Sequence, residues 1–160
     1  MADELQEIIN EFVIEAEETL ERIDPMFVDL EAKGYDRDIL NEIFRGMHTL
    51  KGAAGFLGFS QIVDVSHRAE SIMKRLRDGE LTLTKDLMDL ILKSVDMLKL
   101  LISQIKKGDG SEVDVSSILN ELDSAILITK DQSQKMQNRE NNEPQDLSIN
   151  DSQQDVFSEN

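Results

Sequence analysis

The sequence contains no cysteine and no tryptophan, and aromatic residues make up only 4% of its 160 residues. The lack of cysteine excludes disulfides, thiol nucleophiles and thiolate metal sites, and it fits a reducing compartment. No stretch approaches the roughly eighteen apolar residues of a membrane span. The first residues are acidic, and they lack the basic start and apolar run of a secretory signal. We therefore expect a soluble, cytoplasmic protein.

Basic residues are also scarce, with 17 Lys and Arg against 33 Asp and Glu and a net charge of −16. An acidic surface repels phosphate backbones and anionic lipids, so nucleic acid and membranes are not expected partners. The chain is 39% hydrophobic, enough to bury one modest aliphatic core. We expect one domain whose partners are proteins.

Apolar residues recur at intervals of three and four, and no alternating strand pattern occurs. The sequence therefore predicts an all-α fold, an antiparallel up-down bundle of four helices with a fifth, weaker C-terminal helix. The expected helices cover residues 3–32, 37–58, 60–78, 85–107 and 115–129. Asp36, Ser60 and Thr84 are the expected N-caps of the second, third and fourth helices. Pro25 should kink the first helix without dividing it.

The composition changes after residue 130. Gln, Asn, Ser, Asp and Glu dominate residues 131–160, and the helical periodicity ends. We expect residues 1–130 to form the domain and residues 131–160 to be a disordered, flexible acidic and polar linker toward the rest of a longer protein.

One histidine stands among several glycines within the second predicted helix. Glycine costs about 1 kcal/mol against alanine inside a helix, so its repetition needs another reason. At about 100° per residue, Gly52 and Gly55 lie on the side of His48, away from the apolar stripe, and Lys51 returns to this side one turn later. This arrangement favours a docking surface around a reactive imidazole. A solvated surface histidine and glycines for close helix packing are the alternatives.

A second histidine, His67, lies three residues before Glu70 in the third predicted helix. If the second and third helices pack antiparallel, this pair can face His48 and Lys51 near the connecting turn. A carboxylate there would accept a hydrogen bond from Nδ1–H and leave Nε2 nucleophilic. A surface ion cluster explains the same pattern equally well. A di-iron bundle would need Glu-x-x-His on two helices, so we expect no metal site.

These residues belong to a longer pattern, Phe-Arg-x-x-His-x-x-Lys-Gly-x-x-Gly-x-x-Gly-Phe at 44–59, followed by His-x-x-Glu at 67–70. The pattern resembles the histidine phosphotransfer (HPt) domain at the N-terminus of the CheA family of chemotaxis histidine kinases. The resemblance covers residues 3–129. Ala53 departs from it, because CheA sequences often carry glycine there, and this should change helix stability more than chemistry.

The resemblance implies that His48 is the phosphoacceptor, whose Nε2 attacks the γ-phosphate of ATP bound with Mg²⁺ in a separate kinase domain. The group would then pass to an aspartate in the receiver domain of a CheY-like or CheB-like response regulator. Glu70 would accept from Nδ1–H of His48, Lys51 would lie near the phosphoryl group, and His67 would complete the network around Glu70. The chain itself would bind no cofactor and would act as substrate and carrier within a histidine kinase.

We expect these partners to dock on a locally basic surface around the histidine and the bundle to be a monomer. The expected docking residues are small or basic: Arg45, Gly52, Gly55, Arg68, Lys74 and Arg77. Two other functions fit the pattern, an HPt module of a non-chemotaxis phosphorelay and a structural or adaptor bundle in which His48 is inert.

Overall fold

The computed structural model describes residues 2–108, 110, 112–128 and 138. Its helices are α1 (Ala2–Lys33), α2 (Arg37–Leu57), α3 (Ser60–Arg77), α4 (Lys85–Lys107) and α5 (Ser116–Ile126). Within these residues no strand is present, which confirms the predicted all-α class. The linker expected at 131–160 lies outside the described part apart from residue 138.

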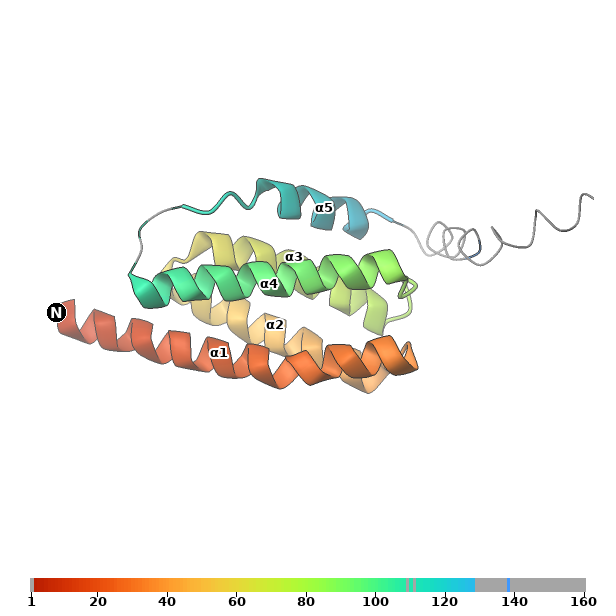
Figure 1. Ribbon diagram of the computed structural model, residues 1–160, viewed down its shortest axis with the longest axis horizontal. Coiled ribbons are helices and arrows are strands. Elements are labelled where there is room, and N and C mark those ends of the chain that lie inside the picture. The colour runs from red at the N-terminus through yellow and green to blue at the C-terminus, as the bar shows by residue number, and fades with distance from the viewer. Residues whose placement is uncertain (1, 109, 111, 129–137, 139–160) are drawn as a thin grey trace, which may run out of the picture.

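Helices α1 to α4 form an up-down bundle in which each helix runs antiparallel to the one before it (Figure 1). Helix α2 packs on α1 and α3, and α4 packs on the same two helices from the other side, in pairs α1–α4 and α3–α4. Helix α5 lies against α3 and α4. The apolar stripes close on one core, in which Ile43, Met47 and Leu98 are fully buried.

Two of the three predicted N-caps are confirmed. Oδ1 of Asp36 accepts from the backbone N–H groups of Asp38 and Ile39, at 3.0 and 3.2 Å. Oγ1 of Thr84 accepts from the N–H of Leu87 at 3.1 Å. Each side chain satisfies donors that the first helical turn leaves unpaired.

The prediction that Ser60 caps α3 is wrong, because Ser60 is the first helical residue and Phe59 is the N-cap, without a side-chain bond. Helix α2 ends at Gly58, whose φ of 78° is the left-handed conformation that glycine adopts without strain. The N–H of Phe59 then donates to the carbonyl of Ala54, and the carbonyl of Phe59 already accepts from Val63. The chain therefore re-enters a helix one residue earlier than the serine suggests.

The other helix boundaries follow the pattern closely. Helix α1 continues across Pro25 as a single helix, and the expected kink remains a prediction. Helix α5 is shorter than predicted, because Val115 and Leu127 are its capping residues. None of the helices in the described part is long and apolar enough to cross a bilayer.

Gly46 sets the close approach of α2 to α1. A Cβ atom at this position would lie 3.3 Å from Cγ2 of Ile23 and 3.4 Å from Cγ2 of Thr19, which is tighter than ordinary packing. The sequence pattern alone does not reveal this role of Gly46. Gly46 lies two residues before His48, so the close contact between α1 and α2 also sets the position of His48 relative to α1.

Helix α5 is attached to α3 by apolar and polar contacts. Ile118, Leu122 and Ala125 of α5 are buried. Three α3 side chains at seven-residue intervals bond to the α5 segment: Gln61 to the carbonyl of Val113, Arg68 to the carboxylate of Asp123, and Arg75 to the carbonyl of Ile126. Because seven residues are nearly two helical turns, these side chains share one face of α3.

Candidate functional site

The imidazole of His48 meets the carboxylate of Glu70 across the interface between α2 and α3. Nδ1 of His48 lies 3.3 Å from Oε1 of Glu70, although the residues are 22 positions apart. The tight turn at Gly58 and Phe59 makes this possible, since it returns the chain antiparallel beside α2. The side chain of His48 is 63% exposed, so Nε2 is accessible to a large partner. The predicted pairing of these two residues is confirmed.

Glu70 also faces Lys51, whose Nζ lies 2.8 Å from Oε2. The ammonium is therefore a close cationic neighbour of Oε2. Burial raises the pKa of the Glu70 carboxyl, but hydrogen bonds and charge from Lys51 and His48 outweigh burial and place the pKa below its ordinary value. The carboxylate is therefore ionised at neutral pH.

An ionised carboxylate can only accept hydrogen bonds, and this determines the tautomer of His48. The proton must sit on Nδ1, where it is donated to Glu70, so that Nε2 carries the free lone pair. Lys51 contributes indirectly, because it holds the Glu70 carboxylate in place. The arrangement presents a nucleophilic nitrogen to solvent and holds a negative charge behind it.

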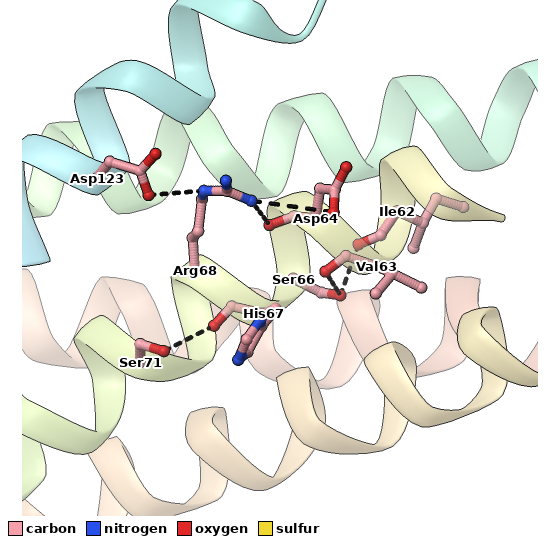
Figure 2. Close-up of polar contacts among 8 residues, drawn as sticks. All are labelled: Ile62, Val63, Asp64, Ser66, His67, Arg68, Ser71 and Asp123. Carbon is pink, nitrogen blue, oxygen red and sulfur yellow. Dashed lines mark hydrogen bonds and ion pairs between the residues drawn. The ribbon is translucent and has the colours of Figure 1, made fainter.

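His67 does not join this network, contrary to the expectation from the resemblance. Its side chain is exposed and makes no hydrogen bond within the described part of the chain, while its backbone carbonyl accepts from Ser71 at 3.0 Å. Figure 2 shows its ring on the side of α3 away from α5. The second oxygen of Glu70 faces Lys51 instead.

An aromatic ring lies beside the imidazole on α2. Phe44 stands one turn before His48, and their ring centroids are 6.1 Å apart with an angle of 23° between the planes. The guanidinium of Arg77 lies 4.6 Å from the centroid of the Phe44 ring. Phe44 therefore contacts both His48 and a cation from the end of α3.

Gly52 and Gly55 are exposed, as expected for a docking surface. A Cβ atom at Gly52 would meet nothing within 4 Å, and one at Gly55 would meet only Cγ2 of Val63 at 3.8 Å. The alternative that these glycines serve close helix packing is therefore wrong. Arg45 and Lys74 are exposed on the same two helices, and neither forms an ion pair in the part of the chain that the structure describes.

Arg68 was predicted to dock partners, but its guanidinium is engaged within the molecule. Nε donates to Oδ1 of Asp123 at 2.7 Å, and Nη1 donates to the carbonyl of Asp64 at 3.1 Å (Figure 2). These bonds direct Arg68 toward α5, whereas Glu70 faces α2. Arg68 is therefore an attachment for α5 and no part of a basic surface around His48.

Arg77 is also engaged, although it was predicted to be free for docking. Its Nη1 donates to Oδ1 of Asn41 at 3.0 Å, and its Nε donates to Oδ1 of Asp78 at 3.0 Å. The side chain is only 18% exposed. Arg77 therefore joins the end of α3 to α2 and holds its charge over Phe44.

Two other kinds of site were considered, a groove away from His48 and a metal site. A groove of about 610 Å³ runs between α4 and α5, lined by residues such as Leu81, Leu90 and Ala125, and it includes neither His48 nor Glu70. In the part of the chain that the structure describes, no three His, Cys, Asp or Glu side chains are placed to hold a metal ion.

Comparison with known proteins matches the chain to a family model described as "Hpt domain", over residues 7–108. The "Sensor histidine kinase CheAY" of Helicobacter pylori is 40% identical over 124 residues, which are 78% of this chain but 15% of that protein. The "CheA phosphotransferase domain from Thermotoga maritima" is 37% identical with a TM-score of 0.60, covering 62% of this chain and 94% of that one.

A third match concerns the fold alone. The phosphorylated P1 domain of CheA3 from R. sphaeroides, solved in complex with CheY6, is 21% identical with a TM-score of 0.66, covering 75% of this chain and 95% of that chain.

Proposed function

The chain belongs to the Hpt domain family, and on that basis we propose that it is the phosphoryl carrier of a CheA-type chemotaxis histidine kinase, with His48 as phosphoacceptor. The observation that carries the proposal is the contact of His48 Nδ1 with Glu70, which leaves an exposed Nε2 as the nucleophile. The relatives named as sensor histidine kinase and CheA phosphotransferase domain support it.

The arrangement suits attack by Nε2 on a phosphoryl group. The lone pair of Nε2 forms a bond to the γ-phosphorus of ATP, the bond from that phosphorus to the bridging oxygen breaks, and ADP leaves. Nδ1 keeps its proton, so the ring becomes cationic as the N–P bond forms. The ionised Glu70 lies 3.3 Å from Nδ1 and stabilises this developing charge without any proton transfer.

The reaction needs partners that supply what this chain does not. ATP and Mg²⁺ would be held by a separate kinase domain, and the phosphoryl group would pass to an aspartate of a CheY-like or CheB-like receiver domain. The P1 domain bound to CheY6 in the third match supports such a partner. We propose that the protein acts in the cytoplasm. We also propose that the bundle is a monomer and binds no cofactor itself.

Labelling with ATP and a chemotaxis-type kinase core tests the proposal. The wild type should gain an acid-labile, base-stable phosphoryl label, and His48→Gln should gain none. The chain has only two histidines, so His67→Gln is a matched control that should keep the label. Label that persists on His48→Gln, or no label on the wild type, would contradict the proposal. The absence of label on the wild type is the result expected for an inert adaptor bundle.

A further inference from the structure

We propose that Phe44 and Arg77 are positioning residues for His48. Phe44 restrains the plane of the imidazole ring so that Nδ1 can meet Glu70, and Arg77 holds Phe44 in place. The effect on the reaction rate rests on the proposed function, whereas the effect on the imidazole does not.

The contact with Glu70 is a weak restraint by itself. At 3.3 Å it is longer than an ordinary charge-assisted hydrogen bond, and the side chain of His48 is 63% exposed to competing water. Rotation of the ring about its Cβ–Cγ bond would carry Nδ1 away from the carboxylate. A single long bond at an exposed site needs a second contact to hold one ring orientation.

Phe44 supplies this second contact. Its ring plane lies within 23° of the imidazole plane at a centroid distance of 6.1 Å, in the range where aromatic pairs attract. Residues four apart on a helix are neighbours on its surface, so α2 itself places the two rings side by side. Rotation of the imidazole out of this plane would lose the ring contact together with the bond to Glu70.

Arg77 completes the arrangement from α3. Its guanidinium lies 4.6 Å from the centroid of Phe44, a distance at which a cation is attracted to the ring face. Asn41 and Asp78 bind the guanidinium at 3.0 Å each, so the cation is itself fixed. The chain of contacts runs from the end of α3 through Phe44 to the imidazole, separately from the contact through Glu70.

The test is Phe44→Leu, which keeps an apolar side chain and removes the flat ring. The ¹⁵N chemical shifts of the imidazole report its tautomer, and the variant should show a larger Nε2–H fraction at His48 than the wild type. Phosphorylation by a kinase core should lose about three- to tenfold in kcat with KM unchanged, the range of an ordinary aromatic contact. Phe44→Tyr keeps the ring and should restore both values.

Three further variants separate positioning from general packing. Phe59→Leu removes a ring that pairs with Phe12 at 5.3 Å, and it should leave the tautomer of His48 unchanged. Arg77→Met removes the cation but keeps an apolar side chain; it should shift the tautomer in the same direction as Phe44→Leu, and Arg77→Lys should partly reverse the shift. If circular dichroism shows that Phe44→Leu does not fold, the tautomer of His48 in Arg77→Met and Arg77→Lys tests the inference.

An unchanged tautomer in Phe44→Leu and Arg77→Met, or an equal change in Phe59→Leu, would overturn the inference. If the wild type accepts no phosphoryl group, the proposed function fails, and the tautomer measurement still decides the role of Phe44 and Arg77.

Discussion

Nζ of Lys51 lies 2.8 Å from Oε2 of Glu70, on the carboxylate oxygen opposite the one that faces His48. One carboxylate thus receives a fixed cation on one side and an imidazole on the other. The cation lowers the pKa of the carboxyl and holds it in place, and the carboxylate fixes the proton of the imidazole.

Replacing Glu70 by alanine should impair the chemistry selectively. The variant loses the bias toward a nucleophilic Nε2 and the charge that stabilises the cationic ring, so phosphorylation by a kinase core should fall at least about a hundredfold. Transfer from phosphorylated His48 to a receiver should fall less, because the receiving aspartate and its Mg²⁺ supply much of that step. Rates of both half-reactions, with circular dichroism as the control for folding, check this. Equal losses in both would refute it.

Folding stability should depend on the ionisation of Glu70. Its pKa in the folded state lies below the ordinary value of 4.5, so the ionised carboxylate stabilises the fold above that pH. The contribution is lost as the pH falls from 4.5 through the lowered folded pKa. Urea unfolding of the wild type and Glu70→Gln, at several pH values from neutral to acid, should show a stability difference that shrinks over this range. A difference independent of pH would contradict the prediction.

Lys51→Met should slow phosphorylation because it removes the cation that holds the Glu70 carboxylate in place beside His48. We expect a loss of about tenfold in kcat, typical of one missing charge contact. Lys74→Met is the matched control, since Lys74 is an exposed lysine one turn after Glu70 without an ion pair in the described part of the chain. It should change KM for the kinase core in a salt-dependent way and leave kcat alone. Similar, salt-independent effects of both variants would show that this distinction is wrong.

Gly52→Ala should stabilise the domain, whereas a larger side chain at the same position should weaken binding to a partner. The added methyl group meets nothing within 4 Å, so the helix gains about 0.5–1 kcal/mol in free energy of unfolding. A larger side chain, as in Gly52→Gln, should raise KM for the kinase core because it occupies the surface beside His48. Gly46→Ala is the comparison, and it should gain less than Gly52→Ala, because its methyl group lies 3.3 Å from Ile23. Chemical denaturation and kinetics together measure both effects.

Arg68→Met should loosen α5 without affecting the site. The ion pair with Asp123 is partly exposed, so its loss should cost about 0.5–1 kcal/mol in free energy of unfolding. A double-mutant cycle with Asp123→Asn should recover most of this value as coupling. The phosphorylation rate should equal that of the wild type. A large rise in KM for a partner would instead support the original docking role of Arg68.

The central part of the site was predictable because its geometry is local. His48, Lys51 and Glu70 lie on two consecutive helices joined by a short turn, so helical spacing and antiparallel packing already bring them together. The helices themselves follow from the apolar periodicity, and the caps at Asp36 and Thr84 from side-chain chemistry.

The predictions that were wrong or missing concern residues whose contacts depend on tertiary structure. A guanidinium can reach in several directions, and only the positions of α5 and Asn41 decide where Arg68 and Arg77 bind. The role of Gly46 depends on how closely α1 and α2 approach, which no local pattern records. Ser60 was misplaced because the left-handed turn at Gly58 lets the next helix start at once.

Helix α3 makes specific contacts on two faces, and these contacts limit where residues can be inserted or deleted within it. Gln61, Arg68 and Arg75 bond to α5 and to the segment just before it on one face, while Glu70 faces His48 on another. One inserted residue turns everything after it by about 100°, so an insertion between Arg68 and Glu70 would separate Glu70 from His48 and Arg75 from α5 together. Even an insertion of seven residues, which nearly restores the rotation, would move these side chains by about 10 Å along the helix axis and away from their partners. Insertions and deletions among relatives should therefore fall outside α3.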